Sequence, residues 1–397
     1  MSHPSMRLSR RQALLGLATS FTLGRAALAL GAAPTDRRFV VVILRGALDG
    51  LSAVVPYGDK ALVLHRPELV MAQPGAEGGL LDLGGFYGLH PALSGLHAMY
   101  RANEVLPVHA MAGPYRIRSH FEAQDYLEYG ADHAMSSGWL NRVASLMPQA
   151  KGATDTAFSV GSVVPLLLRG PQPVGSWLPK TFAQPEPDLY ARLAALHRAD
   201  PITGPAVAEG LKERGFSAVA LAGSDEPANR YAFQALCSSA GKLLATKDGP
   251  RLAALEIGGW DTHAGQKNRL AGPLKQLDDG MVALKTALGD QWGKTVVLVM
   301  TEFGRTVRAN GTGGTDHGTG SVAFVLGGGV AGGRVQANWP GLSPGNLFEN
   351  RDLQPTADLR ALTKGLLGQH FGIDQAGLAQ VFPESDRAAA LPGLLRA

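Results

Sequence analysis

The sequence predicts an α/β protein, and two observations support that prediction. Apolar runs rich in β-branched residues have the length and content of buried strands, and other segments place apolar residues at helical spacing. The strand-like runs cover residues 38–44, 104–111, 252–257, 295–300 and 321–326. The helical segments cover residues 91–103, 121–128, 270–288 and 358–370. Residues 60–90 show no period, and residues 150–235 are predicted to be proline- and glycine-rich connectors with helical pieces.

The chain of 397 residues begins with a segment typical of an export signal. Residues 9–15, SRRQALL, form a twin-arginine pattern, and residues 27–29, ALA, form a small-residue cleavage site after an apolar region. A membrane anchor is the alternative, but the apolar run is short and is interrupted by Arg25. We therefore expect residues 1–29 to be a Tat signal and the mature chain to reach the periplasm already folded, with the Tat translocase as a transient partner.

The charge and cysteine content exclude several classes of protein. The chain has 37 basic and 33 acidic residues, and the leader contains four arginines and no acid, which leaves 33 of each in the mature chain. This balance argues against a nucleic-acid partner or stable insertion at an anionic membrane. The single cysteine, Cys237, cannot form an internal disulfide or a thiolate zinc cluster. Any metal must therefore be held by His, Asp and Glu.

The most informative stretch is residues 295–320, where polar groups follow a buried strand. Glu302 and Arg305 come directly after the strand, and a glycine-rich loop then leads to Asp316 and His317. Sites in α/β proteins are built at the carboxyl ends of strands. The alternative is that Glu302 is a solvated cap and Asp316 a turn residue. Because two other strands are followed by similar residues, we favour a site.

Those two strands supply three further candidates for metal ligands. Asp49 follows the strand at 38–44, although the Asp-Gly pair is also a turn signal. Asp261 and His263 follow the strand at 252–257. On an extended segment, side chains two residues apart point the same way, so both can reach one ion.

Ser119 precedes the helix predicted at 121–128 and has two interpretations. With Glu122 three residues later, it fits a helix capping box. It also fits a nucleophile or an anion-binding hydroxyl, because a helix N-terminus attracts anionic groups.

Two familiar sequence patterns occur in the chain, but neither has the context that its function requires. The GxGxxG pattern at 327–332 is not followed by a helix, and the GxSxG pattern at 341–345 contains Pro344, which lacks the N–H needed for an oxyanion hole.

Five stretches, taken together, resemble one family. They are RGALDGLSAVVPYGD (45–59), RSHFEAQDYLEYG (118–130), GGWDTHAGQ (258–266), TEFGRTVRANGTGGTDHG (301–318) and RDLQPTADLRALTKGLL (351–367). From about Arg38 to Gly372 the chain resembles the DUF1501 family, which is related to the alkaline phosphatase/sulfatase superfamily. The resemblance implies one domain over residues 30–397, built on a mostly parallel sheet with helices on both faces. It also implies metal ligands at strand ends and a hydroxyl nucleophile at a helix N-terminus.

The resemblance can be followed residue by residue at five positions. Asp49 matches the acid after the first strand, which bridges toward the metals. Asp261 and His263 resemble the Asp/His pair of one metal site. Glu302 stands where an Asp is usual, and His317 resembles the late histidine that completes the first site.

Two departures from the superfamily pattern change the expectation. Phe303 stands where a histidine commonly follows the acid of the second site, so the second metal should be weak or absent. The chain lacks a Cys-x-Pro-x-Arg motif, so formylglycine chemistry is not expected.

The leading hypothesis is an exported, metal-dependent hydrolase of phosphate or sulfate esters, with a small-molecule or polymer substrate. Asp261, His263 and His317 would hold one tight divalent ion, which the mixed N/O ligands suggest is zinc, manganese or iron. Asp49 and Glu302 would hold or tune a second, weaker ion.

The hypothesis also assigns catalytic roles to three residues that are not metal ligands. The ion would polarise the ester oxygen and activate Ser119 or a water, with His120 and Arg305 as oxyanion partners. The main alternative is a non-enzymatic exported protein that binds a ligand or a surface partner through a degenerate site. A third reading keeps the metal in a structural role.

Overall fold

The computed structural model describes residues 35–147, 156–161, 163–177, 200, 233–247 and 249–396. The predicted Tat signal, residues 1–29, lies outside these ranges. Within them, no helix combines the length and apolar character needed to cross a membrane.

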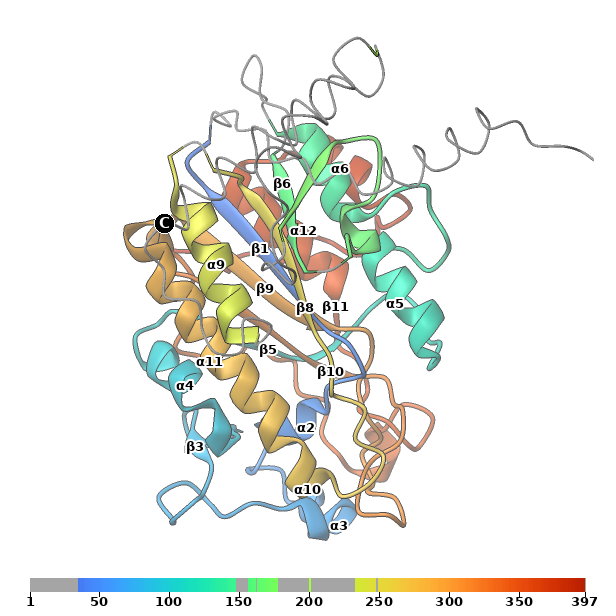
Figure 1. The fold of residues 1–397 in the computed structure, drawn as a ribbon. Coiled ribbons are helices and arrows are strands. Elements are labelled where there is room, and N and C mark those ends of the chain that lie inside the picture. The colour runs from blue at the N-terminus through green and yellow to red at the C-terminus, as the bar shows by residue number, and fades with distance from the viewer. Residues whose placement is uncertain are drawn as a thin grey trace, which may run out of the picture.

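An eight-stranded sheet forms the centre of the fold (Figure 1), in the order β11-β5-β10-β9-β1-β8-β6-β7. Its strands are β1 Arg38–Leu44, β5 Val105–Ala112, β6 Ala157–Val160, β7 Val174–Trp177, β8 Leu252–Ile257, β9 Thr295–Thr301, β10 Ser321–Leu326 and β11 Ala357–Asp358. Strand β10 runs antiparallel to its neighbours β5 and β9, and the other neighbouring pairs are parallel. The predicted mostly parallel α/β sheet is confirmed.

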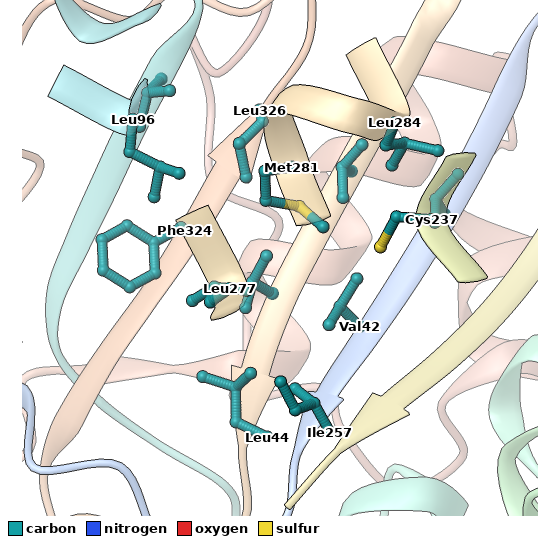
Figure 2. Close-up of a cluster of buried hydrophobic side chains, with 14 of the residues drawn as sticks. Val42, Leu44, Leu96, Cys237, Ile257, Leu277, Met281, Leu284, Phe324 and Leu326 are labelled. Carbon is teal, nitrogen blue, oxygen red and sulfur yellow. The ribbon is translucent and has the colours of Figure 1, made fainter. Parts of the chain in front are cut away.

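Helices cover both faces of this sheet (Figure 1). One face carries α4 Ser94–Arg101, α9 Phe233–Ala245 and α11 Ala271–Leu288. The other carries α5 His120–Tyr129, α6 Trp139–Leu146, α12 Leu359–Phe371 and α13 Gln375–Val381. Alternate residues of β1 enter opposite cores, because successive side chains of a strand point to opposite faces. Val42 packs with Leu277 and Met281 of α11 (Figure 2), whereas Val41 lies in the core that contains Trp139 and Leu366.

Short elements connect the large ones. They are α2 Gly50–Ala53, α3 Ala61–His65, α10 Gln266–Arg269, β2 Val54–Val55, β3 Leu81–Asp82 and β4 Gly88–Leu89, with the 3₁₀ turns η1 Pro67–Leu69, η2 Pro91–Leu93, η3 Leu166–Leu168, η4 Gly289–Lys294 and η5 Pro344–Asn346. Strands β2, β4 and β3 form a second, antiparallel sheet. Helices α2, α3 and α10 gather near the end of the large sheet at which β1 finishes (Figure 1).

The predicted elements differ from the observed ones mainly where elements are short. The predicted strands at 38–44, 252–257 and 321–326 coincide with β1, β8 and β10. Sequence patterns missed β6 and β7, which have four residues each, since so short a run has no resolvable period. The aperiodic stretch at 60–90 contains α3 and the strands β3 and β4, whose lengths of two to five residues leave no periodic signal.

Two buried histidines are held in the neutral state by their packing. His109 on β5 donates from Nε2 to the Val54 carbonyl at 2.9 Å, while its Nδ1 accepts from the Ala110 N–H at 2.8 Å. His370 on α12 donates from Nε2 to the Arg38 carbonyl at 2.9 Å. Burial lowers the pKa of each imidazole to about 4. A proton added to the His109 ring would also have to sit on Nδ1. That nitrogen could then no longer accept the hydrogen bond from the Ala110 N–H.

We predict that His109 makes the protein less stable in acid. The unfolded histidine takes up a proton near its ordinary pKa of 6.5, whereas the folded one does so only near 4, so the unfolded state binds more protons in this window and stability falls with pH. At about 1.4 kcal/mol per pKa unit, the penalty approaches roughly 3 kcal/mol below pH 4.

The measurement is urea unfolding of wild type and His109→Gln in EDTA from pH 7.5 to pH 4. The stability difference between them should shrink as the pH falls, because only the wild type carries the penalty. The substitution Val42→Ala, which removes no titratable group from the core, serves as the control and should show a constant difference. A constant difference for His109→Gln as well would contradict the prediction.

Candidate metal centre

The sheet topology brings five segments of the chain to one edge. Strands β1, β5, β8 and β9 run in the same direction, so the segments after them emerge together, and the antiparallel β10 begins at that same edge. The carboxyl edge of a parallel sheet is where α/β proteins build their sites. The polar residues noted in the sequence therefore have a common place to meet.

Four side chains converge at this edge: His120 at the start of α5, Asp261 and His263 after β8, and His317 before β10. Ligand atoms of His120, Asp261 and His317 all lie within 4.8 Å of one another. The Nε2 atoms of His120 and His317 lie 3.6 and 3.5 Å from carboxylate oxygens of Asp261. His263 Nε2 lies 3.0 Å from Asp261 Oδ1 and 2.9 Å from His317 Nε2. We call these four residues the His/Asp cluster.

Each histidine of the cluster is oriented through its other ring nitrogen. The Nδ1 atoms lie 2.8 Å from Glu302 Oε1 for His120, 2.7 Å from the Arg118 carbonyl for His317, and 3.2 Å from Asp316 Oδ1 for His263. Carbonyl and carboxylate oxygens only accept hydrogen bonds, so they assign the proton to Nδ1 in His120 and His317, whereas His263 has a carboxylate oxygen within 3.2 Å of each ring nitrogen. In a neutral ring, Nε2 then carries a lone pair. Metal-binding histidines are held by this same arrangement.

Two features of the cluster indicate a place for a cation. The Nε2 atom of His120 is buried and finds no hydrogen-bond partner among the described residues, and such a buried polar atom costs about 1–3 kcal/mol. The Nε2 atoms of His263 and His317 face each other at 2.9 Å, where two lone pairs repel unless a cation or proton lies between them. Two nitrogens bound to one metal at about 2.0–2.1 Å lie roughly 3.0–3.4 Å apart. The donor set fits a divalent ion.

Glu302 stands behind His120 and is fully buried. Its carboxylate accepts from the Gly46 N–H at 2.8 Å, from Gln124 at 3.0 Å and from the Thr301 hydroxyl at 2.9 Å, besides its contact with His120. Burial raises the pKa of Glu302, but the hydrogen bonds from His120 and Gln124 outweigh it and the net shift is downward. The hydrogen bond to Glu302 in turn raises the pKa of His120. Glu302 thus orients a cluster residue and does not itself belong to the cluster.

Ionisation of the cluster suits metal binding. Burial acts to raise the pKa of Asp261, but the hydrogen bond and the positive charge of Arg305 outweigh that effect, and the net shift is downward. The Asp261 carboxylate is therefore ionised at neutral pH. Burial lowers the pKa of His317 and favours its neutral ring. Phe303 packs its ring 5.0 Å from the rings of both His120 and His317. The centroids of those two imidazole rings are themselves 4.3 Å apart, so the phenyl group packs against both candidate ligands from one side.

Arg305 has contacts that differ from the predicted oxyanion role. Its guanidinium is fully buried. The acceptors around it are the carbonyls of Gly46, Ala47, Trp260 and Thr315, at 2.7–3.2 Å, and Asp261 Oδ1. These acceptors engage Nε, both N–H groups of Nη2 and one N–H of Nη1, and Nη1 also lies 3.5 Å from His263 Nε2. The guanidinium is therefore directed at groups of the protein.

Asp49 lies apart from the His/Asp cluster. Its carboxylate accepts hydrogen bonds from Arg66 Nη1 at 2.7 Å, from the Ser52 hydroxyl at 2.7 Å and from the side-chain amide of Gln266. It also accepts from the Leu51 N–H as the N-cap of α2. The structure thus gives Asp49 a buried ion pair and a capping role, in place of the predicted metal contact.

Ser119 and His120 occupy the start of α5. Ser119 is the N-cap residue by position, with an extended backbone, but its side chain makes no capping hydrogen bond. The capping-box interpretation is therefore not realised, and the hydroxyl is not committed to the helix. His120, predicted as an oxyanion partner, instead joins the cluster. A histidine at the beginning of a helix, next to the candidate nucleophile, was the sequence signal for this position.

Glycines allow the two segments that carry Arg305 and His317 to approach closely. These residues form an antiparallel bridge. A Cβ on Gly304 would lie 1.9 Å from the Gly320 carbonyl oxygen, and one on Gly318 would lie 2.3 Å from the Arg305 carbonyl carbon. Neither position can accept a side chain without moving the backbone beside the cluster.

Comparison with solved structures finds distant similarity. The C-terminal periplasmic domain of EptC from Escherichia coli, in complex with zinc, has 9% identity and a TM-score of 0.38, and covers 76% of each chain. An alkaline phosphatase from the Antarctic bacterium TAB5 has 13% identity and a TM-score of 0.36, over 76% of this chain and 94% of its own. A Vibrio parahaemolyticus protein in the alkaline phosphatase superfamily has 12% identity and a TM-score of 0.33, over 83% and 72%. We draw no functional conclusion from similarities at this level.

Sequence comparison identifies the family. No curated protein matches the chain significantly. Residues 103–382, more than half of the chain, match the family model described as "Protein of unknown function (DUF1501)". This region includes all four residues of the His/Asp cluster together with Glu302 and Arg305. The protein is therefore a member of the DUF1501 family.

Proposed function

We propose that this protein is a metal-dependent hydrolase of phosphate or sulfate esters. The observation that carries the proposal is the convergence of three imidazole Nε2 atoms on the carboxylate of Asp261, with every Nδ1 held by an acceptor. Three or four N/O ligands with oriented rings are typical of catalytic zinc, manganese and iron sites. In the proposed centre, His120, Asp261 and His317 hold the ion, and His263 completes the set.

The chain's own residues suit hydrolysis of an anionic ester. A bound divalent ion would supply Lewis acidity toward the ester oxygen and lower the pKa of a bound water. Glu302 and Arg118 keep two of the histidines in the tautomer that leaves Nε2 free. The N-terminus of α5, a helix of ten residues, contributes a positive dipole end next to the cluster. Ser119 has an uncommitted side chain at that terminus and is the candidate nucleophile.

The proposal extends to the location and partners of the protein. Export by the Tat translocase, inferred from the leader, would deliver a folded chain to the periplasm, with its metal acquired before or during export. The substrate would be a small molecule or a polymer with an ester group, without nucleic-acid binding or stable membrane insertion. Three predictions test the centre itself.

We predict that His120→Ala and His317→Ala each abolish binding of the tight ion, because each removes a nitrogen ligand that lies beside the carboxylate of Asp261. Metal content is measured by elemental analysis of the exported protein and by titration after chelation. His133→Ala, an exposed histidine just beyond the other end of α5, is the matched control and should retain the ion. If wild type has no affinity for zinc, manganese or iron, the proposal fails.

We predict that Glu302→Gln weakens metal affinity about 10–100-fold without removing the ion, since loss of an outer hydrogen-bond partner typically has this effect. The amide has the shape of the carboxylate but not its charge, so His120 loses the partner that makes its ring more basic. Competition titration against a chelator of known affinity gives the value. An affinity equal to that of wild type would show that Glu302 only fills space.

We predict that Ser119→Ala keeps the ion but reduces hydrolysis of aryl phosphates and sulfates at least 100-fold, because it removes the nucleophile and leaves the ligands intact. Ser119→Cys would retain a nucleophilic atom and serves as the comparison. If Ser119→Ala is fully active, the attacking group is a water. A wild type that holds metal but cleaves neither class of ester would favour the binding-protein or structural-metal alternative.

A further inference from the structure

The carboxylates that could have held a second ion are already bound to side chains of the protein. Asp49 pairs with Arg66 at 2.7 Å, and Glu302 holds His120. Among the described residues, His120, Asp261 and His317 form the single group whose ligand atoms lie close enough for one ion. The positive charge in direct contact with Asp261 of that group is the guanidinium of Arg305.

We infer that the centre takes one metal ion and that Arg305 occupies a second cation position beside it. This inference rests on the metal centre of the proposed function and adds the number of ions and the residue that sets it. Arg305 Nη2 donates to Asp261 Oδ1, and Nη1 lies 3.5 Å from His263 Nε2. The guanidinium therefore touches two members of the His/Asp cluster from the buried side.

The oxygen atoms around Arg305 resemble the surroundings of a cation. Carbonyls of Gly46 and Ala47 come from the loop after β1, that of Trp260 from the loop after β8, and that of Thr315 from the loop before β10. Together with the Asp261 carboxylate they form a cage of five oxygen-bearing groups around one positive charge. Carbonyl and carboxylate oxygens are also the ligands that calcium and other hard cations prefer.

The guanidinium has two consequences for the centre. Its charge repels a second metal ion, and it remains in place under conditions that strip metal from the protein, because an arginine does not lose its proton at accessible pH. It also fixes Asp261, whose carboxylate is otherwise about half exposed. Arg305 is thus a positioning residue that acts on the ion through Asp261, and it contributes a fixed positive charge toward an anionic ester.

The experiment counts ions in wild type, Arg305→Ala and Arg305→Lys. Each chelated protein is titrated with Zn²⁺ and, separately, with Zn²⁺ followed by Ca²⁺ or Mn²⁺, and bound metal is determined by elemental analysis. Wild type should bind one Zn²⁺ and no further ion. Arg305→Ala exposes the oxygen cage and should bind a second ion, Ca²⁺ or Mn²⁺, that wild type rejects. Added guanidinium ion should compete with that second ion.

Arg305→Lys keeps the charge but cannot reach all the acceptors, so it should still bind one ion, about 10-fold more weakly. This variant keeps the test valid if Arg305→Ala does not fold. Arg66→Lys, an equally buried arginine paired with Asp49, is the matched control and should leave zinc affinity unchanged.

The outcomes separate this inference from the proposed function. Two tight ions in wild type would overturn the single-ion inference and leave the hydrolase proposal standing. No ion in wild type would overturn both. One ion in wild type, with Arg305→Ala gaining no second ion or Arg305→Lys matching wild-type affinity, would overturn the role given to Arg305.

Discussion

The buried guanidinium of Arg305 holds together the loops that form the candidate centre. It binds carbonyls from the loops after β1 and β8 and before β10, and it contacts Asp261 directly. A buried charge without partners would be prohibitively costly, so these loops must keep the positions that satisfy it. The guanidinium adds to the backbone hydrogen bonds between these loops, such as that from the Thr315 N–H to the Thr262 carbonyl at 3.2 Å, and it fixes the position of Asp261 in the cluster.

The second determinant of the centre is the set of acceptors behind the histidine rings. Glu302, Asp316 and the Arg118 carbonyl each bind one Nδ1 atom, and the Arg118 side chain is itself anchored by the buried Asp352 at 2.7 Å. The Nε2 lone pairs of His120 and His317 therefore lie beside Asp261 before any ion binds. Such preorganisation lowers the reorganisation needed for metal binding and favours a rigid, selective centre.

Sequence patterns were sufficient for much of the fold and part of the site. The strands β1, β9 and β10 are buried on both faces, and β8 is buried except at Glu256, so their apolar runs are clear in the sequence. Because parallel strand ends converge, Asp261, His263 and His317 could be grouped before their distances were known. The same reasoning grouped Asp49 with them, since a local pattern does not reveal that Arg66 already neutralises its charge.

The sequence by itself determined the class of the fold, the edge of the sheet at which the polar groups gather, and the types of ligand available. Only the tertiary structure decided which of those groups share one site. His120 joins the cluster because α5 packs its first turn against Glu302, a contact between residues 182 positions apart. Arg305 turns inward because carbonyls from two distant loops, after β1 and after β8, surround it together with one from its own loop. Such long-range contacts depend on the packing of whole elements, which short sequence patterns do not encode.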